Sequence, residues 1–168
     1  MFTDEDLREM FEECKYELEQ LGYPLVEMTG IKFTKGAKNY IGKCLLDKKC
    51  KFDLNTFTYK NKAVRITIHG ALRDLPVSER WKVKTVVMHE AIHCVDIDVH
   101  DVIEDVGISH GPVYDKIRKE VETKYGYTNI DDHDYNGLAK YIKEKRDLKE
   151  KSGSVGTDPS FPITPSKQ

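Results

Sequence analysis

The sequence predicts an α+β fold in which an N-terminal helix and a small three-stranded sheet precede two further helices that pack against the sheet. Three observations favour this class. Apolar residues recur at helical spacing between positions 7 and 21, alternate with polar residues between positions 26 and 68, and return to helical spacing from about position 78. A chain of 168 residues suffices for one domain with a buried core.

The first expected element is an amphipathic helix. Thr3 and Asp6 are spaced as in a capping box with Asp in place of Glu, and the three acids of the first turn suit the helix dipole. We expect Gly22 to end the helix. The apolar stripe that should face the core consists of Leu7, Met10, Phe11, Cys14, Leu18 and Leu21.

The pattern changes to that of strands in the middle of the chain. Residues 26–33 and 40–46 are predicted strands, and residues 63–69 alternate most clearly. Residues 48–62 are polar enough for a turn, a third irregular strand and a hairpin. His69, at the end of the clearest strand, is expected to be a surface or core histidine and not a metal ligand.

The next predicted helix runs from about Ser78, as its N-cap, to Val95. An acid-rich loop follows over residues 96–108. Pro112 then suits the first turn of another helix, which Gly126 would close.

The C-terminal part is expected to lie outside the main domain. We assign residues 1–130 to the domain and 131–150 to a helical extension, with a short helix from about Tyr135 to Lys149. The tail, residues 151–168, is rich in Ser, Pro, Gly and Thr and is predicted to be disordered.

The sequence His89-Glu90-Ala91-Ile92-His93 is the strongest functional signal of the chain. On a helix, His89 and His93 lie one turn apart on the same face, where two imidazoles can hold one metal ion. Glu90 can then take a proton from a metal-bound water. Because apolar flanks place this helix in the core, unpaired imidazoles and a carboxylate there would be costly. The sequence favours a metal site over accidental spacing on a solvated helix.

Zinc with an open catalytic position takes three protein ligands. The candidates for the third are His100, Glu104, His110 and Glu120. The extended motif with a third histidine six residues after His93 fails, because that position is Val99. We favour His110, since the helix that begins beside it can pack along the motif helix, and we expect Gly111 to allow close backbone approach.

Together, His89-Glu90-x-x-His93 and the later segment His110-Gly111-Pro112-Val113-Tyr114 resemble the SprT-like metalloprotease domain, the family of the Spartan DNA–protein crosslink proteases. The strand with a Gly-basic-Cys element in residues 40–44 is also similar, and the match spans about residues 4–126. The chain departs from the family in two places. Ser109 replaces the usual glycine before the third histidine, and the C-terminal zinc ribbon is missing, because no cysteine follows Cys94.

The resemblance implies a zincin-like minimal protease. Zn²⁺ would be held by His89, His93 and His110, and Glu90 would be the general base that activates water for attack on a peptide bond. Its substrates would be proteins, including DNA-bound or crosslinked ones. Tyr114 and His100 are weaker candidates for contacts to the substrate or to the ligands, and Tyr114 is more often a core aromatic. The loop acids Asp96, Asp98, Asp101 and Asp105 are candidate acceptors for the ligand imidazoles, although a solvated acidic loop is the favoured interpretation for most of them.

Two other classes of protein are compatible with the sequence. In a zinc-binding adaptor the same histidines would serve structure, which leaves Glu90 without a role. In a nucleic-acid-binding module the basic middle of the chain would carry the function, with peptidase activity secondary or absent.

Charge is strongly segregated along the chain, although the net charge is only −2. Residues 30–84 contain fourteen basic and four acidic residues, whereas residues 1–29 contain two basic and nine acidic ones. The basic region could face DNA phosphates, or it could simply be offset by acidic helices in the fold.

The remaining composition gives expectations about surroundings. No apolar run is long enough to span a bilayer, and the acidic N-terminus lacks the features of a secretory signal. The four cysteines, which form no C-x-x-C pair, are expected to be reduced thiols. We expect a monomer that is not secreted and resides in the cytoplasm, or in the nucleus of a eukaryote.

Overall fold

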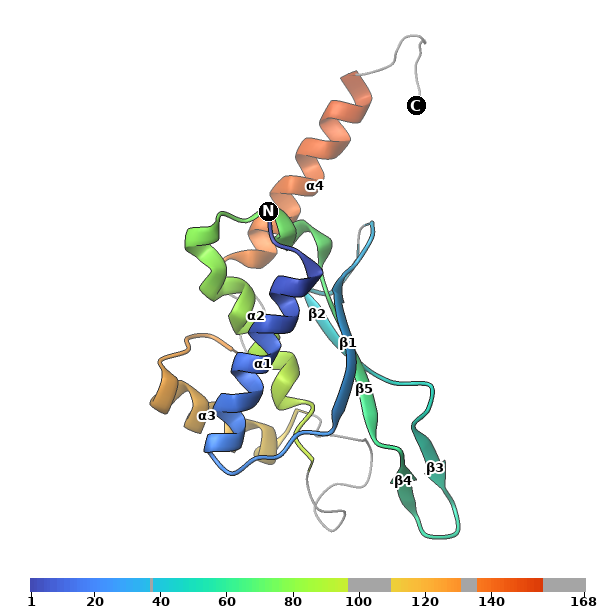
Figure 1. Ribbon diagram of the computed structural model, residues 1–168. Coiled ribbons are helices and arrows are strands. Elements are labelled where there is room, and N and C mark those ends of the chain that lie inside the picture. Colours follow the sequence, from blue (N-terminus) through green and yellow to red (C-terminus); the bar gives the residue numbers. More distant parts are fainter. Residues whose placement is uncertain (37, 97–109, 131–135, 156–168) are drawn as a thin grey trace.

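The computed structural model describes residues 1–36, 38–96, 110–130 and 136–155. It confirms the α+β class. The helices are α1 (Asp4–Gln20), α2 (Arg80–Ile92), α3 (Pro112–Tyr125) and α4 (Leu138–Val155). Helices α1 and α2 pack against a small sheet, α3 packs on these two helices, and α4 projects from the body (Figure 1). Two short 3₁₀ turns, η1 (Gly70–Asp74) and η2 (Val77–Glu79), precede α2.

The main sheet is mixed and has three strands in the order β1-β5-β2. Its strands are β1 (Glu27–Phe33), β2 (Gly42–Leu46) and β5 (Ala63–Ile68). The central strand β5 pairs parallel to β1 and antiparallel to β2. As predicted, β5 alternates in burial and is the best-buried strand. This order places β2 at the sheet edge, where it lies along α2.

Between β2 and β5, the chain forms a hairpin that is separate from the main sheet. Strands β3 (Lys51–Asp53) and β4 (Thr58–Lys60) pair antiparallel and extend away from the body (Figure 1). The prediction of a third irregular strand and a hairpin in residues 48–62 is confirmed by this pair.

Helix α1 begins as the sequence predicts. The Thr3 hydroxyl accepts a hydrogen bond from the Asp6 amide at 3.1 Å, and the Thr3 amide donates to the Asp6 carboxylate at 2.7 Å, which completes the capping box. The stripe residues Leu7, Met10, Phe11, Cys14 and Leu18 are all buried. The helix ends at Gln20, and Gly22 follows with a φ of 94°, a conformation that favours glycine.

Helix α2 is shorter at both ends than predicted. Ser78 is not its N-cap: residues 77–79 tighten into η2, and the cap is Glu79, which makes no side-chain capping hydrogen bond. The helix ends at Ile92, not Val95, because the chain leaves it to pair with an earlier segment. There the Val26 amide donates to the Cys94 carbonyl at 2.8 Å, and Leu25 and Val95 form a bridge.

Helix α3 agrees with the prediction, with Pro112 in its first turn and Gly126 closing it in the left-handed conformation. Helix α4 continues past the predicted Lys149 to Val155, so the segment predicted as a disordered tail begins inside a helix. The predicted start near Tyr135 and the tail over 156–168 lie outside the described residues.

His69 is a buried core histidine, as expected. It is 6% exposed, caps η1 by accepting a hydrogen bond from the Ala71 amide at 3.1 Å on Nδ1, and has a pKa lowered by burial. In the described parts of the chain, no helix is both long and apolar enough to cross a membrane.

Gly70 joins β5 to η1 where the chain has no room for a side chain. A Cβ at this position would lie 2.3 Å from the Thr34 carbonyl oxygen, whereas a Cβ at Gly30 would meet nothing within 4 Å. Since the obstacle at Gly70 is backbone, Gly70→Ala should lower the free energy of unfolding by about 1–3 kcal/mol. Gly30→Ala is the matched control and should change it by less than about 0.5 kcal/mol. Urea unfolding of both variants checks this, and equal stabilities would contradict it.

Candidate metal centre

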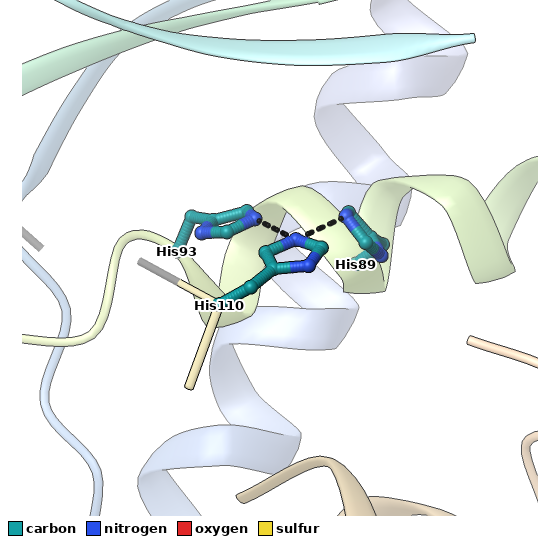
Figure 2. A group of neighbouring side chains, drawn as sticks. All are labelled: His89, His93 and His110. Atoms are coloured by element: carbon teal, nitrogen blue, oxygen red, sulfur yellow. Dashed lines mark hydrogen bonds between the residues drawn. The ribbon is translucent and has the colours of Figure 1, made fainter. Parts of the chain in front are cut away.

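Three histidine side chains converge at the surface end of the core. His89 and His93 project from α2, and His110 reaches them from the residues just before α3 (Figure 2). The Nε2 atom of His110 lies 3.2 Å from Nε2 of His89 and 2.9 Å from Nε2 of His93. The structure therefore brings together the three ligands that the sequence predicted.

The spacing of these nitrogens suits one metal ion. The ligand atoms lie within 4.8 Å of one another. Three nitrogens at about 2.0–2.1 Å from a tetrahedral ion would be about 3.4 Å apart, which is close to the 3.2 Å and 2.9 Å from His110 to the other two histidines. The three histidines could hold a metal ion, and the cluster has a closed side and an open one: His89 is buried, His93 half-buried and His110 exposed.

Tyr114 supports the cluster from behind. Its ring stacks on His110 with centroids 4.6 Å apart and lies 4.8 Å from the His93 ring. Its hydroxyl donates to the His89 carbonyl at 3.1 Å, and the side chain is fully buried. Of the two roles considered for Tyr114, core aromatic and substrate contact, its burial fits the first. It joins α3 to α2 beside the three histidines.

The outer ring nitrogen of His89 is occupied by the backbone. Nδ1 lies 2.8 Å from the carbonyl oxygen of Ile130, an acceptor that places the proton on Nδ1, so the lone pair of the ring is on Nε2, the nitrogen that faces the cluster. Among the loop acids considered as acceptors for the imidazoles, Asp96 instead accepts a hydrogen bond from the Lys62 ammonium group at 2.7 Å. Asp98, Asp101, Asp105 and His100 lie outside the described residues. A backbone acceptor carries no sequence signature, which is why the sequence did not indicate Ile130.

Contacts with Glu17 on α1 anchor the end of α3 and the start of the segment that leads to Ile130. The Tyr127 hydroxyl donates to the Glu17 carboxylate, and the Tyr125 hydroxyl donates to the Glu17 carbonyl at 3.2 Å. The Ile130 side chain is itself fully buried. Helix α1 therefore fixes the segment that orients a ligand on α2.

Burial sets the protonation of the two central groups in opposite ways. It lowers the pKa of His89 to about 3, with smaller contributions from the neighbouring imidazoles, so His89 is neutral and able to ligate. It raises the pKa of Glu90 to about 8, because the carboxyl is only 3% exposed. A carboxyl poised near neutral pH suits a group that exchanges protons.

Glu90 lies beside the ligands and under strand β2. Its Oε2 is 3.8 Å from Nε2 of His89. A Cβ at Gly42 would lie 2.9 Å from that same Oε2 and 2.9 Å from Cγ1 of Val86, so only glycine leaves room there for the carboxylate. By contrast, a Cβ at Gly111 would meet nothing within 4 Å. The prediction that Gly111 allows a close backbone approach is therefore wrong. A glycine inside a predicted strand was the signal that could have pointed to Gly42.

Comparison with family models, with curated proteins and with solved structures found no match. The likeness to the SprT-like domain therefore stays a prediction based on the motif residues.

The metal-free protein should lose stability as the pH rises above neutrality. Glu90 has a pKa of about 8 in the fold against 4.5 in the unfolded chain, so its contribution is present below 4.5 and is lost as the pH rises through 8. His89 acts oppositely, but only between about 3 and 6.5. Between about pH 6.5 and 8.5 the free energy of unfolding should thus fall by about 2 kcal/mol. Urea unfolding in chelator checks this. Glu90→Gln should remove the decline, and an unchanged pH dependence in that variant would contradict the assignment.

Metal affinity should depend on His110. Replacing His110 by Ala removes one of three nitrogens, and the affinity for Zn²⁺ should fall by at least about a hundredfold. Competition with a chromophoric chelator measures it. His100→Ala is the control, since His100 was the rival third ligand, and should bind as wild type. A loss of affinity in the control equal to that of His110→Ala would refute the three-histidine site.

Proposed function

We propose that the protein is a zinc-dependent endopeptidase of the SprT-like type. The observation that carries the proposal is the placement of a buried carboxyl, Glu90, next to three converging imidazoles. Structural zinc sites usually have four protein ligands, whereas catalytic sites have three and keep one position open. An adaptor would have no need of the carboxyl, whose burial is costly.

Zinc is the metal that fits the proposal. Imidazole ligands suit Zn²⁺, and the His-Glu-x-x-His spacing on a helix is typical of zinc peptidases. When bound, zinc would supply Lewis acidity and lower the pKa of a coordinated water to about 7.

Glu90 would be the general base. Its Oε2 faces the ligand cluster, where it can accept the proton of the attacking water and return it to the leaving amine nitrogen. Gly42 leaves room for this oxygen, since a Cβ there would lie 2.9 Å from it. Tyr114 contributes by holding His110 and His93, not by touching substrate.

Peptides are supported as substrates by the surroundings of the site. The cluster opens on the side of His110, which is exposed. Strand β2, at the edge of the described sheet, runs beside Glu90. An extended peptide can add to such an edge through main-chain hydrogen bonds.

The proposal is tested with Glu90→Gln. The variant should keep about one zinc per chain while casein cleavage falls by about 10²–10⁴-fold, because the amide cannot accept the proton. Glu9→Gln, on the exposed face of α1, is the matched control and should cleave as wild type. Zinc content is measured by elemental analysis beside cleavage rates. Wild-type protein that holds zinc and cleaves nothing would overturn the proposal in favour of the adaptor.

The hairpin favours a second candidate, a nucleic-acid contact. Phe52 and Phe57 are exposed at 38% and 58%, and several lysines lie near them in the sequence. Aromatic faces with lysines suit stacking and phosphate contacts of single strands. Part of this charge is already paired, as in Lys49 with Glu27 and Lys60 with Asp53. Salt-dependent binding of single-stranded DNA without cleavage would favour a binding module, and faster cleavage with DNA would favour DNA-bound proteins as substrates.

We also propose a monomer in the cytoplasm or nucleus. The four cysteines are free thiols, which suits a reducing compartment.

A further inference from the structure

Two cysteines from distant parts of the chain meet behind the metal centre. The Sγ atoms of Cys44, on β2, and Cys94, in the turn just after α2, are 3.9 Å apart. Cys94 directly follows the ligand His93 and is fully buried, whereas Cys44 is partly exposed. The other cysteines have different surroundings: Cys14, for example, lies against the Tyr127 hydroxyl at 3.8 Å.

The meeting follows from how β2 lies on α2. Residues two apart in a strand share a face, so Gly42 and Cys44 lie on the same face of β2. Opposite them lie Glu90, in α2, and Cys94, in the turn two residues after α2 ends. One pair of contacts joins Gly42 to Glu90, and the other joins Cys44 to Cys94. The Cys94 thiol also donates to the Glu90 carbonyl at 3.4 Å. The thiol pair is thus one helical turn from the proposed base.

We propose that Cys44 and Cys94 are a reversible dithiol–disulfide site whose oxidation slows the proposed peptidase. The regulatory part rests on the proposed function, whereas the modification site itself does not.

A small disulfide such as oxidised glutathione is the oxidant. The thiolate of Cys44, the more accessible sulfur, attacks one glutathione sulfur and releases one glutathione thiolate. The thiolate of Cys94 then attacks the Cys44 sulfur of this mixed disulfide and releases the second glutathione. The two protein thiols lose two electrons and two protons, and one oxidised glutathione becomes two reduced molecules.

Disulfide formation would narrow the space that Gly42 leaves for Glu90. The sulfurs need to approach from 3.9 Å to about 2.05 Å, which draws β2 toward the residues that follow α2. At the neighbouring position on β2, a Cβ on Gly42 would lie 2.9 Å from Glu90 Oε2, so the room for the carboxyl is set by the distance between β2 and α2. Closer approach of β2 is therefore expected to shift the carboxyl from its position beside His89.

The first test is independent of activity. Full-length zinc-loaded protein is incubated with oxidised glutathione, free thiols are blocked, and peptides are mapped by mass spectrometry. We expect a Cys44–Cys94 disulfide, restored to thiols by dithiothreitol. Cys94→Ala should stop at a glutathione adduct on Cys44, and Cys44→Ser should yield no adduct on the buried Cys94. Cys50→Ser is the matched control and should form the disulfide as wild type. Absence of the Cys44–Cys94 disulfide in wild type would overturn the proposal.

The second test measures casein cleavage before and after oxidation. The oxidised wild type should be slower by roughly ten- to a hundredfold, with zinc retained, as displacement of a catalytic group by about 1 Å implies. Cys44→Ser should keep its rate in oxidised glutathione. Equal rates of reduced and oxidised wild type would overturn the regulatory role. If neither form cleaves, the proposed function fails, whereas the mapped disulfide would still establish the dithiol site.

Discussion

The burial of helix α2 is the constraint on which the rest of the structure depends. Its inner residues lie between the sheet and α1, yet it carries two imidazoles and a carboxyl, which are costly to bury without partners. The fold meets this cost from several directions. The Ile130 carbonyl forms a hydrogen bond with the His89 ring, and the Tyr114 hydroxyl donates to the His89 carbonyl. Burial raises the pKa of Glu90, which favours its neutral form.

These contacts tie the site to segments far apart in the chain. Glu17 on α1 anchors the tyrosines that precede the Ile130 segment, and the pairing of Val26 with Cys94 follows the C-cap of α2, which is the second histidine of the cluster. Strand β2 reaches across α2 through Gly42 and Cys44. Because each of these links approaches α2 from a different element, a change in any of them is transmitted to the ligands without touching them.

Much of this could be predicted from the sequence where local rules act. The capping box of α1, the alternation of β5, and the proline and glycine that bound α3 are decided by neighbouring residues. The ends of α2 were predicted wrongly because they are not local. The 3₁₀ turn at residues 77–79 replaced a cap at Ser78, and the pairing of residue 95 with Leu25 ended the helix early. The sequence offers the loop acids as candidate partners of the histidines and gives no sign of Ile130, because it shows side chains and not the positions of backbone carbonyls.

The sequence by itself determined the chemical inventory: two histidines one turn apart, a glutamate beside them, and a third histidine before a proline-started helix. Helical periodicity fixes the relation of the first three, since it depends only on spacing. The tertiary structure alone decided that His110 closes the cluster with its Nε2 2.9 Å from that of His93, that Gly42 makes room for Glu90, and that Cys44 meets Cys94. Those contacts join residues 17 to 50 positions apart, and their distances follow from packing between elements, which no local pattern encodes.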